Sequence, residues 1–152
     1  MDRLKILLIL LGTILLFSQC KKDEDEWVLC TDCGLSSWVG NYEGYGDYYS
    51  DDDSTITIIG VPTTVFIENI YDSYLRITVL AEDKFTINFL VSMNDSTYTI
   101  EMPGSNKSLN LTVLRKGSEY RLAGTAKNYH YIADTILYLD NSISFETFKI
   151  QD

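Results

Sequence analysis

The chain has little histidine, proline, cysteine or positive charge. Its 152 residues include one histidine, His130, two prolines and three cysteines. A single histidine leaves a zinc site short of ligands, and no serine or cysteine lies in a nucleophile motif with it. We therefore expect a protein that is not an enzyme, with no catalytic residues and no cofactor.

Acidic side chains outnumber basic ones. The sequence has 22 Asp and Glu against 12 Lys and Arg, which gives a formal net charge of -10. A negative surface repels phosphate groups, so nucleic acid is excluded as a partner.

Helical periodicity is also missing after the first twenty residues. From Ser36 onward apolar and polar residues alternate with a period of two, which indicates half-buried β-strands. Gly60 and Pro62 are expected to end one strand, and a short helical turn at Trp27–Cys30 is left open. The expected strands are 37–45, 54–59, 63–69, 74–79, 84–91, 97–102, 108–113, 119–127, 135–139 and 143–150.

So many short strands cannot remain as an open sheet with long unpaired edges. Such a chain must close on itself or form two sheets, because free edges aggregate. The fold class is therefore all-β, over residues 36–152, and a single antiparallel barrel or a two-sheet sandwich meets the requirement.

The N-terminus combines a basic start with a short apolar run. Arg3 and Lys5 precede residues 6–17, a run too short to span a bilayer, which needs roughly 20 residues. The run closes as Leu16-Phe17-Ser18-Gln19-Cys20, which resembles a bacterial lipobox. The resemblance implies that residues 1–19 are a lipoprotein signal peptide and that Cys20 is acylated with palmitate-type chains. A transmembrane anchor and a plain secretory signal are the alternatives.

A run of charged residues follows Cys20. Lys21-Lys22-Asp23-Glu24-Asp25-Glu26 has no apolar member and cannot fold alone, so residues 20–35 are expected to be a spacer. The run resembles the export signal of Bacteroidetes lipoproteins. That implies a lipid anchor in the outer membrane and display on the cell surface, with the periplasmic face as the alternative. Without residues 1–19, which hold Arg3, Lys5 and Asp2, 10 basic and 21 acidic side chains remain.

The first and last strands carry a second resemblance. Trp38-Val39-Gly40-Asn41-Tyr42 is similar to the opening strand of lipocalin-like (calycin-type) domains, and residues 120–127 and 143–149 are similar to their closing strands. The resemblance implies an antiparallel up-and-down β-barrel of about 8–10 strands. In such a barrel Trp38 would plug the closed end, and Gly40 would let another backbone come near.

A barrel of this kind suggests two noncatalytic functions. The first is binding of a small apolar or amphipathic ligand in an internal cavity. The alternative is an accessory subunit of a cell-surface complex, which predicts a filled interior and an exposed patch of tyrosine and apolar residues. The expected ligand-lining side chains are Trp38, Phe85, Ile87, Phe89, Leu109, Leu111 and Val113.

Two cysteines remain beside the lipidation site. Cys30 and Cys33 flank Thr31-Asp32, and an exported protein meets an oxidising compartment, so we expect a local disulfide or simple thiols. A redox pair and a metal site are the alternatives.

The stretch from Tyr45 to Asp53 is rich in tyrosine and aspartate. It is expected to be a loop over the barrel mouth, where Asp47, Asp51, Asp52 and Asp53 could collect calcium or form a solvated acidic loop, and we assign no metal site. Its tyrosines could stack on a sugar or lipid headgroup or pack over the rim. The candidate rim residues are Tyr45, Tyr48, Tyr49, Tyr129 and Tyr131. Short Asp-Ser/Thr patterns resemble Bacteroidetes O-glycosylation sites, which implies modification at Ser54, Ser96 or Thr135.

Overall fold

The computed structural model describes residues 26–51, 55–71, 73–92, 99–103, 106–132 and 136–150, with backbone alone for 99–103. Within these ranges the chain forms nine strands and one short helix, and every strand pair is antiparallel in a single sheet. The prediction of an all-β antiparallel domain is confirmed. The elements are β1 (Val28–Leu29), α2 (Leu35–Trp38), β2 (Gly40–Ser50), β3 (Ile56–Tyr71), β4 (Tyr74–Ala81), β5 (Phe85–Ser92), β6 (Thr99–Pro103), β7 (Lys107–Lys116), β8 (Glu119–Ile132) and β9 (Ile136–Lys149).

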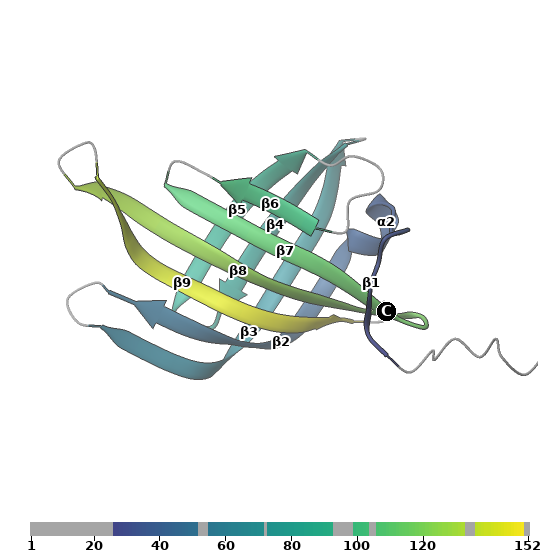
Figure 1. The fold of residues 1–152 in the computed structure, drawn as a ribbon, viewed down its shortest axis with the longest axis horizontal. Helices are drawn as coiled ribbons and strands as arrows, with labels where there is room; N and C mark the ends of the chain where they lie inside the picture. Colours follow the sequence, from purple (N-terminus) through teal and green to yellow (C-terminus); the bar gives the residue numbers. More distant parts are fainter. Residues whose placement is uncertain are drawn as a thin grey trace, which may run out of the picture.

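The order of the strands brings the two ends of the domain together. The sheet runs β1-β7-β8-β9-β2-β3-β4-β5, with β6 also paired to β7. The pairing of β9 with β2 joins the last strand to the first long one. The sheet curls strongly, so that β3, β4 and β5 lie behind β7, β8 and β9 in Figure 1. Among the described residues β5 pairs only with β4, and strand pairing does not close the sheet.

The core lies inside this curl. Along β5 the side chains of Phe85, Ile87, Phe89 and Val91 are buried while those between them are exposed. The same alternation along the other long strands directs one face of the sheet inward. The inward side chains form one continuous hydrophobic cluster.

The predicted break at Gly60-Val61-Pro62 is wrong, because β3 continues through it from Ile56 to Tyr71. Gly60 adopts a φ of +73° in an irregularity of the β2–β3 pairing. The carbonyl of Pro62 accepts from the amide of Glu82, and the β3–β4 pairing begins only at the next residue. Pro62 is paired with Tyr45 of β2, and its missing N–H faces β4 just before the β3–β4 pairing begins.

Two other boundaries differ from expectation. Residues 135–139 and 143–150 were expected as separate strands, but β9 is continuous from Ile136. The register of its pairing with β8 shifts between Asn128 and Tyr129, and the strand continues through this bulge. The first strand begins at Gly40 rather than residue 37, because residues 35–38 form the helical turn α2.

Within the described part of the chain, no helix has the length and apolar character that a membrane crossing requires.

Candidate functional site

The side chains expected to line a ligand cavity lie in the packed core. Trp38, Leu111 and Val113 have no solvent-accessible surface, and the other four predicted residues are at most 8% exposed. A side chain lining a cavity large enough for a ligand would be accessible to water within that cavity. The interior around these residues is therefore filled by protein atoms.

Trp38 and Tyr42 both belong to this core. Both are fully buried, and the Tyr42 hydroxyl lies 2.9 Å from the carbonyl oxygens of Ser37 and Trp38. Burial, with a smaller effect of neighbouring Tyr120, raises the pKa of Tyr42 well above its ordinary value. Gly40, at a φ of +143°, faces the Lys149 side chain rather than another backbone.

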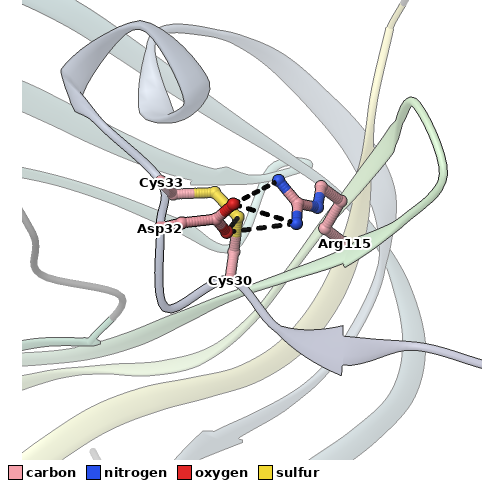
Figure 2. A network of polar contacts seen from close by, with 4 residues as sticks. All are labelled: Cys30, Asp32, Cys33 and Arg115. Atoms are coloured by element: carbon pink, nitrogen blue, oxygen red, sulfur yellow. Dashed lines mark hydrogen bonds and ion pairs between the residues drawn. A yellow bond between two sulfur atoms is a disulfide. The ribbon is translucent and has the colours of Figure 1, made fainter.

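The N-terminal segment pairs with β7 through β1 and contains a disulfide. Cys30 and Cys33 are joined, with their Cα atoms 5.2 Å apart, and are 0% and 2% exposed. Figure 2 shows the Arg115 guanidinium, from β7, facing the Asp32 carboxylate between the two cysteines. Arg115 donates from both terminal nitrogens to Asp32 Oδ2 at 3.2 Å. The sulfurs are buried away from solvent, which favours a structural role over redox exchange.

Part of the predicted spacer is packed against the sheet. The Arg121 guanidinium lies over the Trp27 ring at 4.9 Å and donates to Glu146 Oε1 at 2.8 Å. Trp27 also contacts Phe148 edge to face, with centroids 5.8 Å apart. The part of the 20–35 segment from Trp27 onward thus belongs to the folded domain.

The predicted rim tyrosines do not gather at one mouth. Tyr45–Ser50 belongs to β2 rather than to a loop, so Tyr45 and Tyr48 point to opposite faces of the sheet. Tyr48 is a core residue packed edge to face against Phe85 at 6.4 Å. Tyr45 is 67% exposed on the outer face, where Tyr49 also points. Tyr129 and Tyr131 lie on β8 near its far end.

The aspartates expected to form a loop have separate partners. Asp47 Oδ1 accepts from the Gly60 amide at 3.2 Å, whereas Asp51 Oδ1 accepts from Thr55 Oγ1 at 2.9 Å. The described residues contain no group of three or more His, Cys, Asp or Glu that could hold a metal. Asp52, Asp53, Ser54, Ser96, Thr135 and Cys20 lie outside the described residues.

His130 lies in a polar network on β8 and β9. Its Nδ1 contacts Asp140 Oδ1, and its ring lies 5.6 Å from the ring of Tyr138. The Tyr138 hydroxyl donates to Asp51 Oδ2. This hydrogen bond and the one from Thr55 lower the pKa of Asp51, and the bond to Asp51 raises the pKa of Tyr138. The network connects the end of β2 to β9.

His130, Tyr138 and Asp140 of this network lie on the part of the β8–β9 hairpin that extends past its neighbours. The pairing of β7 with β8 ends at Asn128 and that of β2 with β9 ends at Asn141. Residues 129–132 and 136–140, here named the arm, therefore pair with no third strand among the described residues. At its base the Tyr129 amide donates to the Asn106 carbonyl, and the Asp140 carbonyl accepts from the Asp51 amide. The large apolar side chains exposed on the arm are Tyr131, Ile132, Ile136, Leu137 and Tyr138.

The register pairs Tyr131 with Leu137 on one face of the arm and Ile132 with Ile136 on the other, where Tyr138 also lies. Sequence reasoning identified Tyr131 but not the other four exposed apolar residues. The signal was present in Ile136-Leu137-Tyr138-Leu139, where four large apolar residues follow one another without alternation. A half-buried strand alternates, so this unbroken apolar run departs from the pattern of the other strands.

Comparison of the chain with protein-family models, with curated proteins and with solved structures found no match.

Proposed function

We propose that this chain is a lipid-anchored, noncatalytic interaction subunit that docks a partner protein through the arm. The observation that carries the proposal is the combination of a filled interior with an exposed apolar surface on a projecting hairpin. An accessory subunit has this combination, whereas a carrier of small apolar ligands requires an internal cavity. The proposal therefore takes the second of the two functions expected from the sequence.

The position of the arm supports a protein partner over the anchoring membrane. Figure 1 shows the end of β8 and the start of β9, which form the arm, at the opposite end of the molecule from β1. Along β8 the path from Arg121, beside Trp27, to Ile132 is about 36 Å at roughly 3.3 Å per residue. Even fully extended, the chain from Cys20 to Trp27 covers at most about 25 Å. A lipid at Cys20 would hold the arm out toward solution.

Charge near the arm indicates the chemistry of the partner. The carboxylates of Asp51 and Asp140 border the apolar side chains, and the whole chain is strongly acidic. A complementary partner would present an apolar groove with a basic rim, since charge pairing at a rim mainly speeds association.

The proposal also covers the localisation of the protein and the finer details of its fold. The lipobox-like residues 16–20 and the acidic run after them support lipidation of Cys20 and display on the outer membrane surface, as in Bacteroidetes lipoproteins. The curl of the sheet, with Trp38 buried at one end, supports a lipocalin-like barrel whose seam lies between β5 and the β6–β7 pair.

The arm is tested by extracting the protein from its own host's membranes in mild detergent and measuring the size of the complex. We expect the full chain to migrate in an assembly larger than the monomer. Ile136→Asp should return it to monomer size, because the substitution adds a charge to the apolar surface. The matched control is Ile59→Asp, since Ile59 is 80% exposed on β3, and it should leave the assembly intact.

Three results would refute the proposal: a wild-type monomer, an assembly that survives Ile136→Asp, or an equal loss with the control. The anchor is tested separately by the mass of the N-terminal peptide, which should begin at an acylated Cys20. Protease added to intact cells should remove the domain if it is displayed outside.

A further inference from the structure

A second candidate surface is a hollow on the outer face of the sheet. Four adjacent strands, β7, β8, β9 and β2, bring two rows of outward side chains into register. One row is Thr112, Ala123, Glu146 and Tyr45, and the next is Asn110, Thr125, Ser144 and Asp47. Together with Gly46, Gly124 and Phe145 they line a hollow of about 560 Å³, here named the outer hollow.

The centre of the outer hollow is low because its side chains are small. Ala123, Thr125 and Ser144 form its floor across β8 and β9. Larger groups stand around them, with Tyr45 and Asp47 on the β2 side and Asn110 on the β7 side. The hollow is shallow and open to solvent, so a ligand there would lie along the sheet.

Two carboxylates at the outer hollow each accept a hydrogen bond from another residue of the protein. Asp47 Oδ1 accepts from the Gly60 amide at the β2–β3 irregularity, and Glu146 Oε1 accepts from Arg121. A carboxylate has about four lone-pair sites, so each retains capacity for a further donor. Fixed carboxylates beside hydroxyl groups form a preorganised set of hydrogen-bond partners.

Tyr45 adds an aromatic surface to these polar groups. Tyr45 is 67% exposed. Tyr45 also lines a neighbouring hollow of about 320 Å³ with Glu43, Gly44, Pro62, Thr63 and Thr64. The ring therefore stands between two hollows and can be contacted from both.

The chemistry of this surface selects a class of ligand. Anions are disfavoured by the two carboxylates and by the net charge of -10. A wholly apolar ligand would leave the carboxylates and hydroxyls without partners. A neutral saccharide supplies hydroxyl donors for Asp47 and Glu146, acceptors for the threonine and serine hydroxyls, and a C–H face for the tyrosine ring.

We propose that the outer hollow binds a neutral oligosaccharide, which stacks on Tyr45 and donates hydrogen bonds to Asp47 and Glu146. The chain would extend past the Tyr45 ring into the neighbouring hollow. The outer hollow shares no residue with the arm, so this site stands independently of the protein partner proposed above.

The test is an array of neutral glycans probed with the full mature chain, followed by NMR titration of the strongest glycan. We expect saturable shifts of the Tyr45, Ala123 and Ser144 amides with a dissociation constant in the range of about 0.01–1 mM. Tyr45→Ala should weaken binding by about tenfold or more, because it removes the stacking surface. Asp47→Asn keeps an acceptor for Gly60 but loses the charge, and should also weaken it.

Tyr71→Ala is the matched control, since Tyr71 is 69% exposed on β3 and lies away from the outer hollow. It should leave affinity unchanged. The proposal is overturned if no neutral glycan binds, if binding is unaffected by Tyr45→Ala, or if Tyr71→Ala weakens it equally. Shifts of the same amides by hexalysine but by no glycan would assign the carboxylates to a cationic peptide and would also overturn it.

Discussion

The side chain of Lys107 on β7 donates a hydrogen bond to the backbone carbonyl of Asn88 on β5. Its Nζ lies 2.6 Å from the Asn88 carbonyl oxygen and 5.4 Å from the centroid of the Phe89 ring. These two strands are not hydrogen-bonded to each other through their backbones. Lys107 thus connects two parts of the sheet that are not paired with each other among the described strands.

We expect Lys107→Met to lower the free energy of unfolding by about 1 kcal/mol, because it removes the bond to Asn88 while keeping an apolar stem. Urea denaturation of the purified chain measures this. Lys116→Met, at the other end of β7, is the control and should change stability by less than about 0.5 kcal/mol. Equal effects of the two substitutions would show that Lys107 does not connect the strands.

Tyr42 should make the protein sensitive to alkaline pH. Its raised folded-state pKa means that the stability it contributes is complete below the ordinary tyrosine pKa of about 10. That contribution is lost as pH rises from there through the folded-state pKa, because only the unfolded state ionises freely. Tyr42→Phe should cost about 1–2 kcal/mol at pH 7 and reduce the loss of stability between pH 9 and pH 11.

Thermal unfolding between pH 7 and pH 11, followed by circular dichroism, measures the stability cost at pH 7 and the loss of stability with rising pH. A Tyr42→Phe variant that loses stability with pH as steeply as the parent would contradict the assignment.

Gly124 should not tolerate a methyl group. A Cβ at this position would lie 2.4 Å from Leu111 Cδ2 and 2.5 Å from the Asn110 carbonyl oxygen. The backbone oxygen cannot move away cheaply, so Gly124→Ala should destabilise the fold by about 1–3 kcal/mol. At Gly34 a Cβ would meet no atom within 4 Å, and its φ is -86°.

Gly34→Ala should therefore be neutral or stabilising by up to about 1 kcal/mol. Chemical denaturation of both variants distinguishes a steric effect from a general cost of replacing glycine. Similar values for the two would mean that the contacts at Gly124 relax.

The Cys30–Cys33 disulfide should stabilise the domain modestly. It closes a short loop, for which the chain-entropy estimate is about 2 kcal/mol, and we expect Cys30→Ala/Cys33→Ala to lose about that amount. Because both sulfurs are buried, dithiothreitol should reduce the bond only after denaturant is added. Mass spectrometry after alkylation measures this, and rapid reduction of the native protein would instead indicate an exposed, exchangeable pair.

Several parts of the fold could be read from local sequence. Alternation in residues 84–91 predicted which side chains of β5 face the core, because side-chain direction reverses at each residue of an extended chain. The same reasoning placed Leu109, Leu111 and Val113 inside. It could not say that they would fill the interior, since that depends on how tightly the strands curl.

Local signals failed where a distant partner decided the outcome. Gly60 and Pro62 normally end a strand, yet β3 continues because the pairing with β4 starts after Pro62. Tyr45 and Tyr48 were grouped as neighbours, but the pairing of β2 with β3 and β9 extends the strand and sends them to opposite faces.

The sequence by itself determined the all-β character and the inward face of the strands, because both depend on residues close together in the chain. Tertiary structure decided the packed interior, the projecting arm and the outer hollow. Each of these arises from pairing between strands far apart in sequence, where hydrogen-bond register and sheet curvature bring together side chains such as Tyr45 and Glu146 that no local pattern connects.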